Sequence, residues 1–360
     1  MKYALIGCGR ISANHIKAAR TNNLDIVAIC DIDPSKFDIA LNEASYNKLT
    51  HVQRYKNYKQ MLSDHPDIEL VAIAVESGKH AEIALSCIDA GKHVIIEKPI
   101  ALSMADANEI IDRSCKKNVK VAVCHQNRFN TAVLKTRSAL EAGRFGKISH
   151  GSISIRWNRN EKYYKQASWR GTWDRDGGCM MNQCIHGIDL LRWMMEKEGH
   201  AISVCAQTRQ RLHDYLESED LGVAIVSFSD GSVGLIEGTT NVYPESLEET
   251  FYLFGENATV KIGGISTNTI DVWNFADESK GNKKSSNLKE KIPNYYGNGH
   301  IALYADMIDA IKQDRTPFID AVAGRNALEI VLAIYKSQKT GLPVHLPLDD
   351  FASIDMKKIL

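Results

Sequence analysis

The sequence predicts a two-domain α/β protein, in which a doubly wound parallel sheet precedes an α+β domain with an open, mostly antiparallel sheet. Three observations support this prediction. Short apolar runs alternate with amphipathic stretches up to about residue 124. A glycine-rich turn joins the first apolar run to the first helical stretch. Later stretches alternate polar and apolar residues by twos, with hairpin signals between them.

The first domain is expected to span residues 1–124. Its predicted strands are the apolar runs at residues 3–6, 26–30, 70–75, 93–96 and 120–124. Amphipathic stretches at residues 81–90 and 103–117 are predicted to be helices that connect strands. Runs that are apolar throughout are typical of parallel strands covered by helices on both faces.

The second domain is expected to span residues 125–360. Its predicted strands lie at residues 147–157, 223–228, 233–237, 249–254 and 258–262. Helices are expected at residues 131–142, 301–313 and 321–339, and a polar loop at residues 277–287. The turns Asp230-Gly231 and Gly255-Glu256-Asn257 predict hairpins. Because an open sheet face is a common dimerisation surface, we expect a homo-oligomer, a dimer or tetramer, formed through this sheet.

Composition excludes several classes of protein. Among the 360 residues, Lys and Arg together number 44, as do Asp and Glu, so no overall field favours nucleic acid or an anionic membrane. The eight cysteines form no C-x-x-C pair, which favours free thiols in a reducing cytoplasm over disulfides or a metal site. No apolar run approaches membrane-spanning length, and no signal peptide is expected because the first strand begins almost at once.

The glycine-rich turn has the pattern of a dinucleotide-binding site. Gly7 permits a tight turn, and Gly9 lets the backbone approach a diphosphate at the N-terminus of the next helix. Asp31 ends the second apolar run, where a carboxylate accepts hydrogen bonds from a ribose and repels a 2′-phosphate. Because Ile32-Asp33 follow without a basic residue, NAD is favoured over NADP. The alternative interpretation is an ordinary glycine turn in an α/β sheet.

A lysine follows the fourth apolar run, which ends in Glu97-Lys98-Pro99. Lys98 should therefore emerge at the carboxyl edge of the sheet, where doubly wound folds bind ligands. Pro99 restricts the backbone of Lys98 to an extended form. A partly buried lysine beside a nicotinamide can exchange protons with a substrate hydroxyl. The alternative is a surface lysine that ends a strand.

A second set of polar residues follows Gly177-Gly178 in a predicted helix. Asn182, His186 and Asp189 recur at i, i+4 and i+7, which places them on one helical face. Polar groups on such a face need partners or a ligand. His186 can transfer a proton near neutral pH, and Asp189 would either orient it or pair with a backbone group. A histidine satisfied within the core remains the alternative.

The segment from residue 156 to residue 173 concentrates arginines and aromatic residues. Arg156, Arg159 and Arg170 suit carboxylates and phosphates, whereas Tyr163 and Trp169 offer flat faces to a sugar or base. The segment is too short for an extended nucleic-acid track. Rings that only pack the loop against the sheet are a credible alternative for Trp157 and Trp173.

Taken together, these motifs resemble the Gfo/Idh/MocA oxidoreductases, a family named after glucose–fructose oxidoreductase and inositol dehydrogenase. The likeness covers nearly the whole chain and comprises GCGRIS, Asp31, AGKHVIIEKP, QNRF, and the Gly-Gly pair followed by His186 and Asp189. The combination of RWNR-x₃-YY, WRGTW and NQ-x-x-H is most similar to the NAD-dependent 3-dehydrogenases of UDP-N-acetylglucosaminuronic acid. Those enzymes serve bacterial surface-polysaccharide pathways.

The resemblance implies roles for individual residues. Lys98 and His186 would form the catalytic pair. The implied cofactor-binding residues are Gly7, Gly9, Arg10, Ile11, Asp31, Ser77, His80, Glu97, Lys98 and Gln126, with Glu97 and Gln126 near the nicotinamide. The predicted substrate-binding residues are Arg156, Arg159, Tyr163, Trp169, Arg170, Asn182, Gln183 and His186.

The chain departs from the family pattern at two places. Many relatives carry an aspartate where this chain has Asn182, so an Asp–His relay is unavailable and Lys98 becomes the favoured proton acceptor. The loop at residues 75–80 keeps His80 but lacks the usual proline, which makes contacts from that loop less certain.

We therefore predict NAD-dependent oxidation of a secondary sugar hydroxyl, at C3 of UDP-N-acetylglucosaminuronic acid, in bacterial surface-polysaccharide (O-antigen) biosynthesis. An inositol or free-sugar dehydrogenase of the same family is one alternative. A non-catalytic, dinucleotide-dependent sensor and an imine or double-bond reductase are two others.

Overall fold

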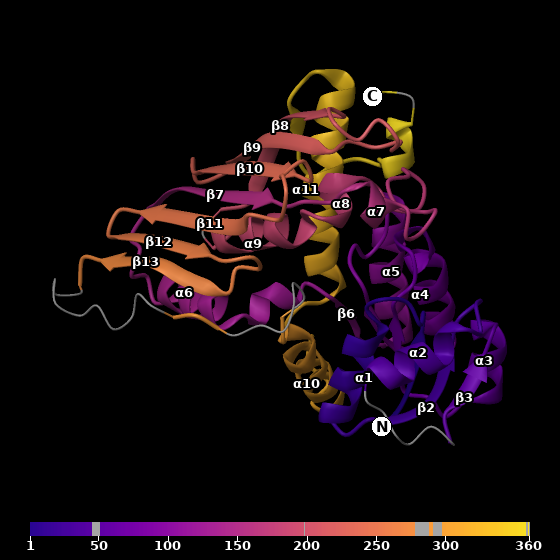
Figure 1. The fold of residues 1–360 in the computed structure, drawn as a ribbon. Helices are drawn as coiled ribbons and strands as arrows, with labels where there is room; N and C mark the ends of the chain where they lie inside the picture. Colours follow the sequence, from indigo (N-terminus) through magenta and orange to yellow (C-terminus); the bar gives the residue numbers. More distant parts are fainter. Residues whose placement is uncertain (45–50, 198, 278–287, 291–296, 358, 360) are drawn as a thin grey trace. The chain divides into compact units, whose positions relative to one another are not determined.

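The computed structural model describes residues 1–44, 51–197, 199–277, 288–290, 297–357 and 359. The chain divides into two compact units, each built around its own sheet (Figure 1). The first unit comprises Met1–Cys124 and His300–Arg325, and the second comprises His125–Gly299 and Asn326–Leu360. No helix among the described residues is long and apolar enough to span a membrane.

The first unit is a doubly wound parallel sheet, as predicted, with the strand order β3-β2-β1-β4-β5-β6. The strands are β1 (Lys2–Ile6), β2 (Asp25–Cys30), β3 (Gln53–Tyr55), β4 (Leu70–Ile73), β5 (His93–Ile96) and β6 (Val121–Val123). All adjacent pairs of strands are parallel. The central strand β4 is fully buried, which is why its sequence is apolar throughout.

The helices that connect these strands are α1 (Ser12–Thr21), α2 (Lys36–Glu43), α3 (Tyr58–Asp64), α4 (His80–Asp89) and α5 (Met104–Lys117). A further helix, α10 (Gly299–Lys312), returns to this unit from later in the chain. In α5, the Ser103 hydroxyl accepts the N–H of Asp106 at the start, and Asn118 adopts a left-handed conformation at the end. Helix α1 contacts α2, and α4 contacts α5, as expected when the chain winds outward from β1 and then returns on the other side.

The first unit includes residues 300–325, which lie within the range predicted for the second domain. Two contacts illustrate why. The Asn22 amide donates to the carbonyl of Ile301 at 3.0 Å, and Asp320 forms an isolated bridge with Ala122 of β6. Residues 300–325, although distant in sequence, therefore pack against the first sheet and its helices.

The second unit is a mostly antiparallel sheet with the order β13-β12-β11-β7-β10-β9-β8-β14. Its strands are β7 (Ile148–Arg156), β8 (Ala201–Arg209), β9 (Leu221–Phe228), β10 (Val233–Thr239), β11 (Glu248–Gly255), β12 (Ala258–Gly263), β13 (Thr269–Phe275) and β14 (Val344–His345). The hairpins β9–β10 and β11–β12 were both predicted. The central pair β7–β10 is parallel. Of the predicted polar loop, residues 278–287 lie outside the described part of the chain.

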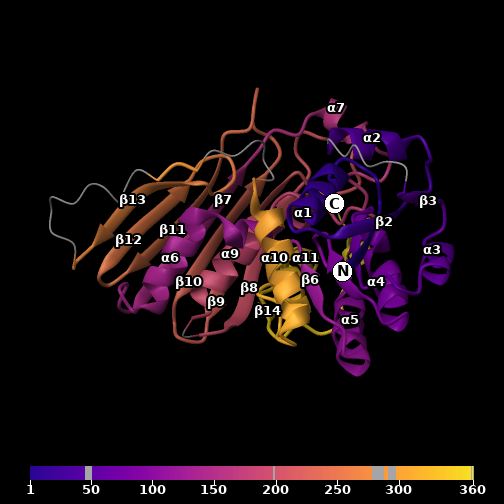
Figure 2. The same ribbon diagram turned by 90° about the horizontal axis from the view of Figure 1, so that it is seen from below.

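Helices α6 (Thr131–Glu141), α8 (Cys179–Asn182) and α9 (Ile185–Met195) pack on one face of this second sheet. The unit also contains α7 (Glu161–Tyr164) and most of α11 (Ala321–Thr340), which begins in the first unit. Helix α9 packs on β7, β10 and β11, and α6 packs on β12, on the same side of the sheet (Figure 2). The fit is close, because a Cβ added at Gly187 would meet Ile153 and Ile155 of β7. On the opposite face, the side chains of Val223, Ile225 and Leu235 are exposed among the described residues, in agreement with the predicted open face.

Candidate active site

The glycine-rich turn after β1 leaves room for a phosphate group. Gly7 has φ +100°, and a Cβ there would collide with the backbone of Ala74, so only glycine fits. At Gly9, by contrast, no described atom lies within 4 Å of an added Cβ. None of the described side chains caps the start of α1. The open space and the uncapped amides together fit a diphosphate.

Asp31, directly after β2, is oriented by backbone amides of two turns. Its carboxylate accepts the N–H of Cys8 at 2.8 Å and the N–H of Asp33 at 2.9 Å. The Lys36 ammonium lies 3.9 Å from the same carboxylate. Asp31 is therefore held beside the glycine turn, where a ribose hydroxyl of a bound dinucleotide is expected.

The predicted contacts in the loop after β4 lie in different environments. Ser77, in the short 3₁₀ helix η1 (Ser77–Lys79), is buried, and so is His80. The ring nitrogens Nδ1 and Nε2 of His80 lie 2.6 Å from the carbonyl oxygen of Pro99 and 3.2 Å from that of Val75. His80 thus ties the loop after β4 to the turn after β5. The remaining predicted cofactor residues of this turn region are the exposed Arg10 and the half-buried Ile11.

Lys98 follows β5 at the carboxyl edge of the sheet, as predicted, and is half-buried. Its backbone N–H donates to Oε2 of the buried Glu97 at 3.2 Å. The other carboxylate oxygen of Glu97 lies 3.1 Å from Nε2 of His15 and 3.0 Å from Nε2 of His300. Lys98 therefore directly follows a buried acid whose two carboxylate oxygens both have hydrogen-bond partners.

One group among the described residues could hold a metal ion. The ligand atoms of His15, Glu97, Cys124 and His300 lie within 4.8 Å of one another. Distances of 3.0–3.1 Å between the imidazole nitrogens and the carboxylate are those of ordinary hydrogen bonds, which account for this geometry without an ion. The expectation of a metal-free protein stays a prediction.

In the second unit, the predicted continuous helix after Gly177-Gly178 is interrupted. Asn182 ends α8, whereas His186 and Asp189 belong to α9, so the three residues do not share one regular helical face. The break lies at Gln183 and Cys184. His186 is 7% exposed, and its ring packs edge-on against His125 at 5.8 Å.

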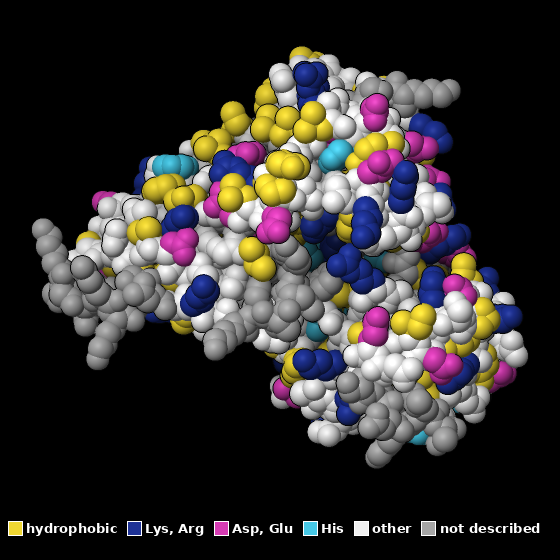
Figure 3. Space-filling model, viewed as in Figure 1, with side chains coloured by type: hydrophobic (Ala, Val, Ile, Leu, Met, Phe, Trp, Pro, Cys, Tyr) yellow, Lys and Arg dark blue, Asp and Glu magenta, His cyan; other side chains and the backbone are white. Residues whose placement is uncertain are grey.

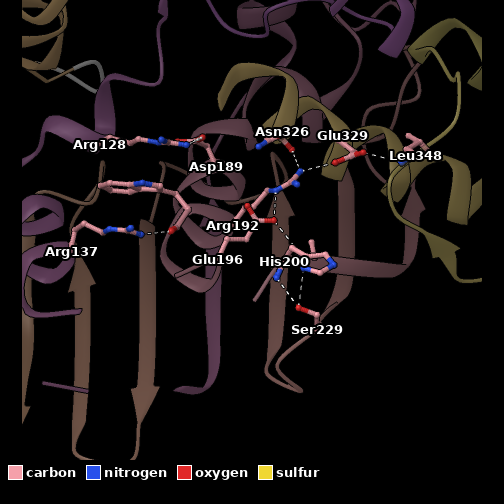
Figure 4. Close-up of polar contacts among 12 residues, drawn as sticks. Arg128, Arg137, Asp189, Arg192, Glu196, His200, Ser229, Asn326, Glu329 and Leu348 are labelled. Carbon is pink, nitrogen blue, oxygen red and sulfur yellow. Dashed lines mark hydrogen bonds and ion pairs between the residues drawn. The ribbon is translucent and has the colours of Figure 1, made fainter. Parts of the chain in front are cut away.

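Asp189 does not orient His186. Its carboxylate binds the Arg128 guanidinium in a bidentate pair, at 2.8 and 2.6 Å (Figure 4). Cation–π contacts also hold α9. The guanidinium carbons of Arg128 and Arg137 lie 4.8 and 4.7 Å from the centroid of the Trp193 ring. The role of Asp189 is therefore to fix the helix that carries His186.

A second anchor joins α9 to α11. Figure 4 shows Arg192 of α9 between Glu196 of its own helix and Glu329 of α11. The distance from Arg192 to Glu329 is 3.0 Å, and Glu329 also accepts the backbone N–H of Leu348. The ion pairs at Asp189 and Arg192 together fix α9, which carries His186.

Four of the predicted substrate-binding residues form one group, which we call the arginine–tyrosine cluster: Arg159, Tyr163, Arg170 and Gln183. Gln183 accepts from Nε of Arg159 at 2.8 Å and donates to the Tyr163 hydroxyl at 2.9 Å. The Arg170 guanidinium lies 4.0 Å from the centroid of the Tyr163 ring, and that of Arg159 lies 5.0 Å from it. Two positive charges thus flank one aromatic ring, close in sequence to His186.

Two neighbours extend this cluster. The Asn182 side chain donates to Asp176 and accepts from Gln183. The Trp169 ring lies 5.5 Å from the Arg170 guanidinium. Trp157 and Trp173 are buried, as the packing interpretation of those rings requires.

Arg156 is a predicted substrate residue that lies apart from this group. Along β7, Ile153 and Ile155 face α9, so Arg156 points to the open face of the sheet. There it pairs with Glu237 at 2.5 Å and Glu248 at 2.6 Å. The sequence revealed the two-residue period but not which face would be covered. The predicted substrate contact of Arg156 stays a prediction.

The glycine turn, the oriented acid after β2 and the amine after β5 define the first unit as the dinucleotide-binding part of an oxidoreductase. Comparisons with known proteins agree. Residues 1–125 match the family model described as "Oxidoreductase family, NAD-binding Rossmann fold", and residues 137–346 match "Oxidoreductase family, C-terminal alpha/beta domain". The chain belongs to the Gfo/Idh/MocA oxidoreductase family, and its cofactor is NAD.

Among solved structures, the WlbA dehydrogenase from Bordetella pertussis, in complex with NADH and UDP-GlcNAcA, is similar to this chain. The identity is 33%, the alignment covers 97% of this chain and 98% of that one, and the TM-score is 0.85. WlbA from Chromobacterium violaceum has the same bound molecules, 32% identity, coverage of 97% and 96%, and a TM-score of 0.85. The myo-inositol 2-dehydrogenase of Thermotoga maritima is 23% identical over 94% of this chain and 96% of its own length. The predicted fold, family and NAD-dependent dehydrogenase class are thus confirmed.

When NAD is bound, the residues present fit it. The uncapped start of α1 and the space at Gly9 suit the diphosphate, and Asp31 suits the ribose. Gln126, predicted near the nicotinamide, belongs to the second unit and is buried, and its Oε1 has no hydrogen-bond partner among the described residues. Its contact with the cofactor stays a prediction.

Sequence reasoning missed His15 and His300, which contact Glu97, and Tyr304, which contacts His15. His15 lies one turn beyond Ile11 in α1 and looks like an ordinary helix residue. His300 and Tyr304 belong to α10, and no local signal connects that helix with residue 97.

Proposed function

We propose that this protein oxidises a secondary hydroxyl of a UDP-linked acidic N-acetyl sugar with NAD, at C3 of UDP-N-acetylglucosaminuronic acid. The arginine–tyrosine cluster carries the proposal. Arg159 and Arg170 present guanidinium groups beside an aromatic ring, which suits a carboxylate or diphosphate next to a sugar. Two similar structures at 32–33% identity have UDP-GlcNAcA bound. A polyol such as inositol offers no anion for these arginines.

In the proposed reaction, bound NAD⁺ would supply the hydride acceptor for the carbon that bears the hydroxyl group. Lys98 takes the hydroxyl proton, and His186 assists by hydrogen bonding to the same oxygen. Lys98 lies in the first unit and His186 in the second, so their meeting around one hydroxyl is part of the proposal. Rigid support of α9 contributes positioning, which can supply several orders of magnitude in rate.

The direct test measures NADH formation with UDP-N-acetylglucosaminuronate. Lys98→Met should abolish turnover because the proton acceptor is lost, while NAD binding is retained. Lys120→Met is the matched control, since Lys120 precedes β6 at the amino edge of the same sheet and pairs with Asp314. Unchanged turnover in Lys98→Met contradicts the assignment.

The second candidate, an inositol or free-sugar dehydrogenase, is favoured by the 23% identity to an inositol dehydrogenase over 94% of the chain. Comparing UDP-sugar turnover with inositol and free-sugar turnover separates the two. NADH binding without turnover of any sugar would instead indicate the non-catalytic sensor.

We further propose that a second copy of the chain covers the open face of the second sheet. A shallow groove there is lined by Ser152, Ser154, Cys205, Val223, Ile225 and Leu235. Val223, Ile225 and Leu235 are 46%, 50% and 42% exposed. Hydrophobic side chains gather over β8–β10, with charges of both signs beside them (Figure 3). A patch that carries apolar groups and both charges suits a self-complementary, two-fold contact.

Size-exclusion chromatography with light scattering tests this interface. Ile225→Glu should yield monomers, because it places a charge in the apolar centre of the contact. Leu212→Glu is the control, since Leu212 is 66% exposed and lies outside the strands. A monomeric wild-type protein contradicts the proposal.

We place the protein in the cytoplasm, in surface-polysaccharide biosynthesis, and its eight free cysteines suit that reducing compartment.

A further inference from the structure

Five buried side chains of the first unit form one hydrogen-bonded chain that ends at Glu97. The Tyr3 and Tyr304 hydroxyls are 2.9 Å apart, and the Tyr304 hydroxyl lies 2.7 Å from Nδ1 of His15. Nε2 of His15 and Nε2 of His300 both lie within 3.1 Å of the same oxygen of Glu97. All five residues are at most 8% exposed, so this chain is shielded from water.

The donors and acceptors of this chain can be assigned. Burial lowers the pKa of His15, which keeps that imidazole neutral with one N–H. If Nε2 of His15 carries that hydrogen, it donates to Glu97, and Nδ1 accepts from Tyr304, whose oxygen accepts from Tyr3. The hydrogen bonds among Tyr3, Tyr304, His15 and Glu97 are then mutually consistent, whereas Nδ1 of His300 has no hydrogen-bond partner among the described residues.

Glu97 is an ionised carboxylate in this arrangement. Burial opposes its ionisation, yet hydrogen bonds from His15 and His300 hold the pKa of Glu97 well below its usual range. Its second oxygen accepts the N–H of Lys98. The structure thus maintains a buried negative charge at the carboxyl end of β5.

Topology relates this charge to the cofactor. The adenosine half is expected beside Asp31, after β2, and the diphosphate at the start of α1, after β1. In the order β3-β2-β1-β4-β5-β6, the nicotinamide half must then extend over the ends of β4 and β5. Glu97 directly follows β5.

We propose that the ionised Glu97, oriented by His15 and His300, makes the protein bind NAD⁺ in preference to NADH. The physical reason is that the nicotinamide ring carries a positive charge when oxidised and none when reduced. A fixed negative charge nearby stabilises only the oxidised ring. Because both imidazoles hold the carboxylate in place, the protein needs no reorganisation to supply this stabilisation. Glu97 is thus a charge that favours the substrate form of the cofactor.

The test measures the dissociation constants of NAD⁺ and NADH, by fluorescence and calorimetry, without any sugar. Glu97→Gln keeps the shape and the acceptor atom but removes the charge. The ratio of the NAD⁺ constant to the NADH constant should rise roughly tenfold, as expected for the loss of one partly screened charge interaction. Tyr304→Phe removes the hydroxyl that fixes the His15 hydrogen, and the ratio should rise by about two- to threefold.

Glu69→Gln is the matched control, since Glu69 lies at the amino end of β4, on the opposite edge of the same sheet. Its ratio should equal that of the wild type. An unchanged ratio in Glu97→Gln or Tyr304→Phe, with melting temperature retained, overturns the proposal, and so does an equal rise in Glu69→Gln. Should Glu97→Gln fail to fold, the Tyr304→Phe ratio decides. The inference rests on the proposed placement of the nicotinamide but on no sugar substrate, so lack of UDP-sugar turnover would not affect it.

Discussion

Glu249 makes the stability of the second unit depend on pH. Its carboxyl group, on β11, is 1% exposed. Oε2 accepts from Asn127 at a long 3.4 Å, and Oε1 has no hydrogen-bond partner among the described residues. Burial raises the pKa of Glu249 from 4.5 to about 8. Between these two values, the folded chain keeps a proton that the unfolded chain has released.

The sign and size of the effect follow from this difference. Because the folded state binds more protons in that window, the free energy of unfolding falls as pH rises, by about 1.4 kcal/mol per pH unit. From about pH 5.5 to pH 8 the loss is about 3 kcal/mol, and above pH 8 it is complete. A glutamine in place of Glu249 imitates the protonated acid and carries no such dependence.

Urea denaturation of the wild type and Glu249→Gln, followed by fluorescence at a series of pH values, measures the effect. The variant should gain about 3 kcal/mol relative to the wild type between about pH 5.5 and pH 8.5. Glu256→Gln, at an exposed hairpin turn, is the control and should run parallel to the wild type. Burial also raises the pKa of Glu219 to about 8. Because the wild type and both variants contain Glu219, its contribution cancels when their free energies of unfolding are compared. Parallel curves for the wild type and Glu249→Gln would refute the reasoning.

Further predictions concern the anchor of α9 and the cofactor turn. Arg128→Leu leaves the carboxylate of Asp189, 2% exposed, without its partner, so the free energy of unfolding should fall by about 3–5 kcal/mol, as measured by urea denaturation. Arg144→Leu is the control, because its partner Asp277 is 59% exposed, and the change should stay near 1 kcal/mol or less. Gly9→Val should lower NADH affinity at least about tenfold without changing the melting temperature, since no described atom lies within 4 Å of a Cβ added at Gly9. Gly7→Ala should lower both the NADH affinity and the melting temperature, because the positive φ of residue 7 and the nearby Ala74 backbone oppose a Cβ there. Equal melting temperatures for Gly7→Ala and the wild type would contradict this account.

Patterns that are local in sequence predicted the fold well. The strand β5 was predicted at its observed bounds, and both hairpins around Asp230-Gly231 and Gly255-Glu256-Asn257 were predicted from turn chemistry. The edge strand β3 was missed because its three residues are polar and exposed or half-buried. A short strand at a sheet edge needs no apolar run.

Contacts between distant residues were beyond prediction. The period of β7 was visible, but the covered face depends on where α9 packs, and that choice placed Arg156 on the open side. The regular spacing of Asn182 and His186 concealed a helix break at Gln183, whose side chain instead joins Arg159 and Tyr163. Similarly, Asp189 binds Arg128, a residue far away in the chain.

The late return of α10 to the first sheet has a consequence for synthesis. A ribosome that has delivered Met1–Cys124 has made all six strands of that sheet but neither His300 nor Tyr304. Until the chain has grown past α10, His15 and Glu97 lack these two neighbours, and a nascent first unit must wait for the intervening sheet to be translated. A fragment cut after residue 124 would carry the same deficiency permanently.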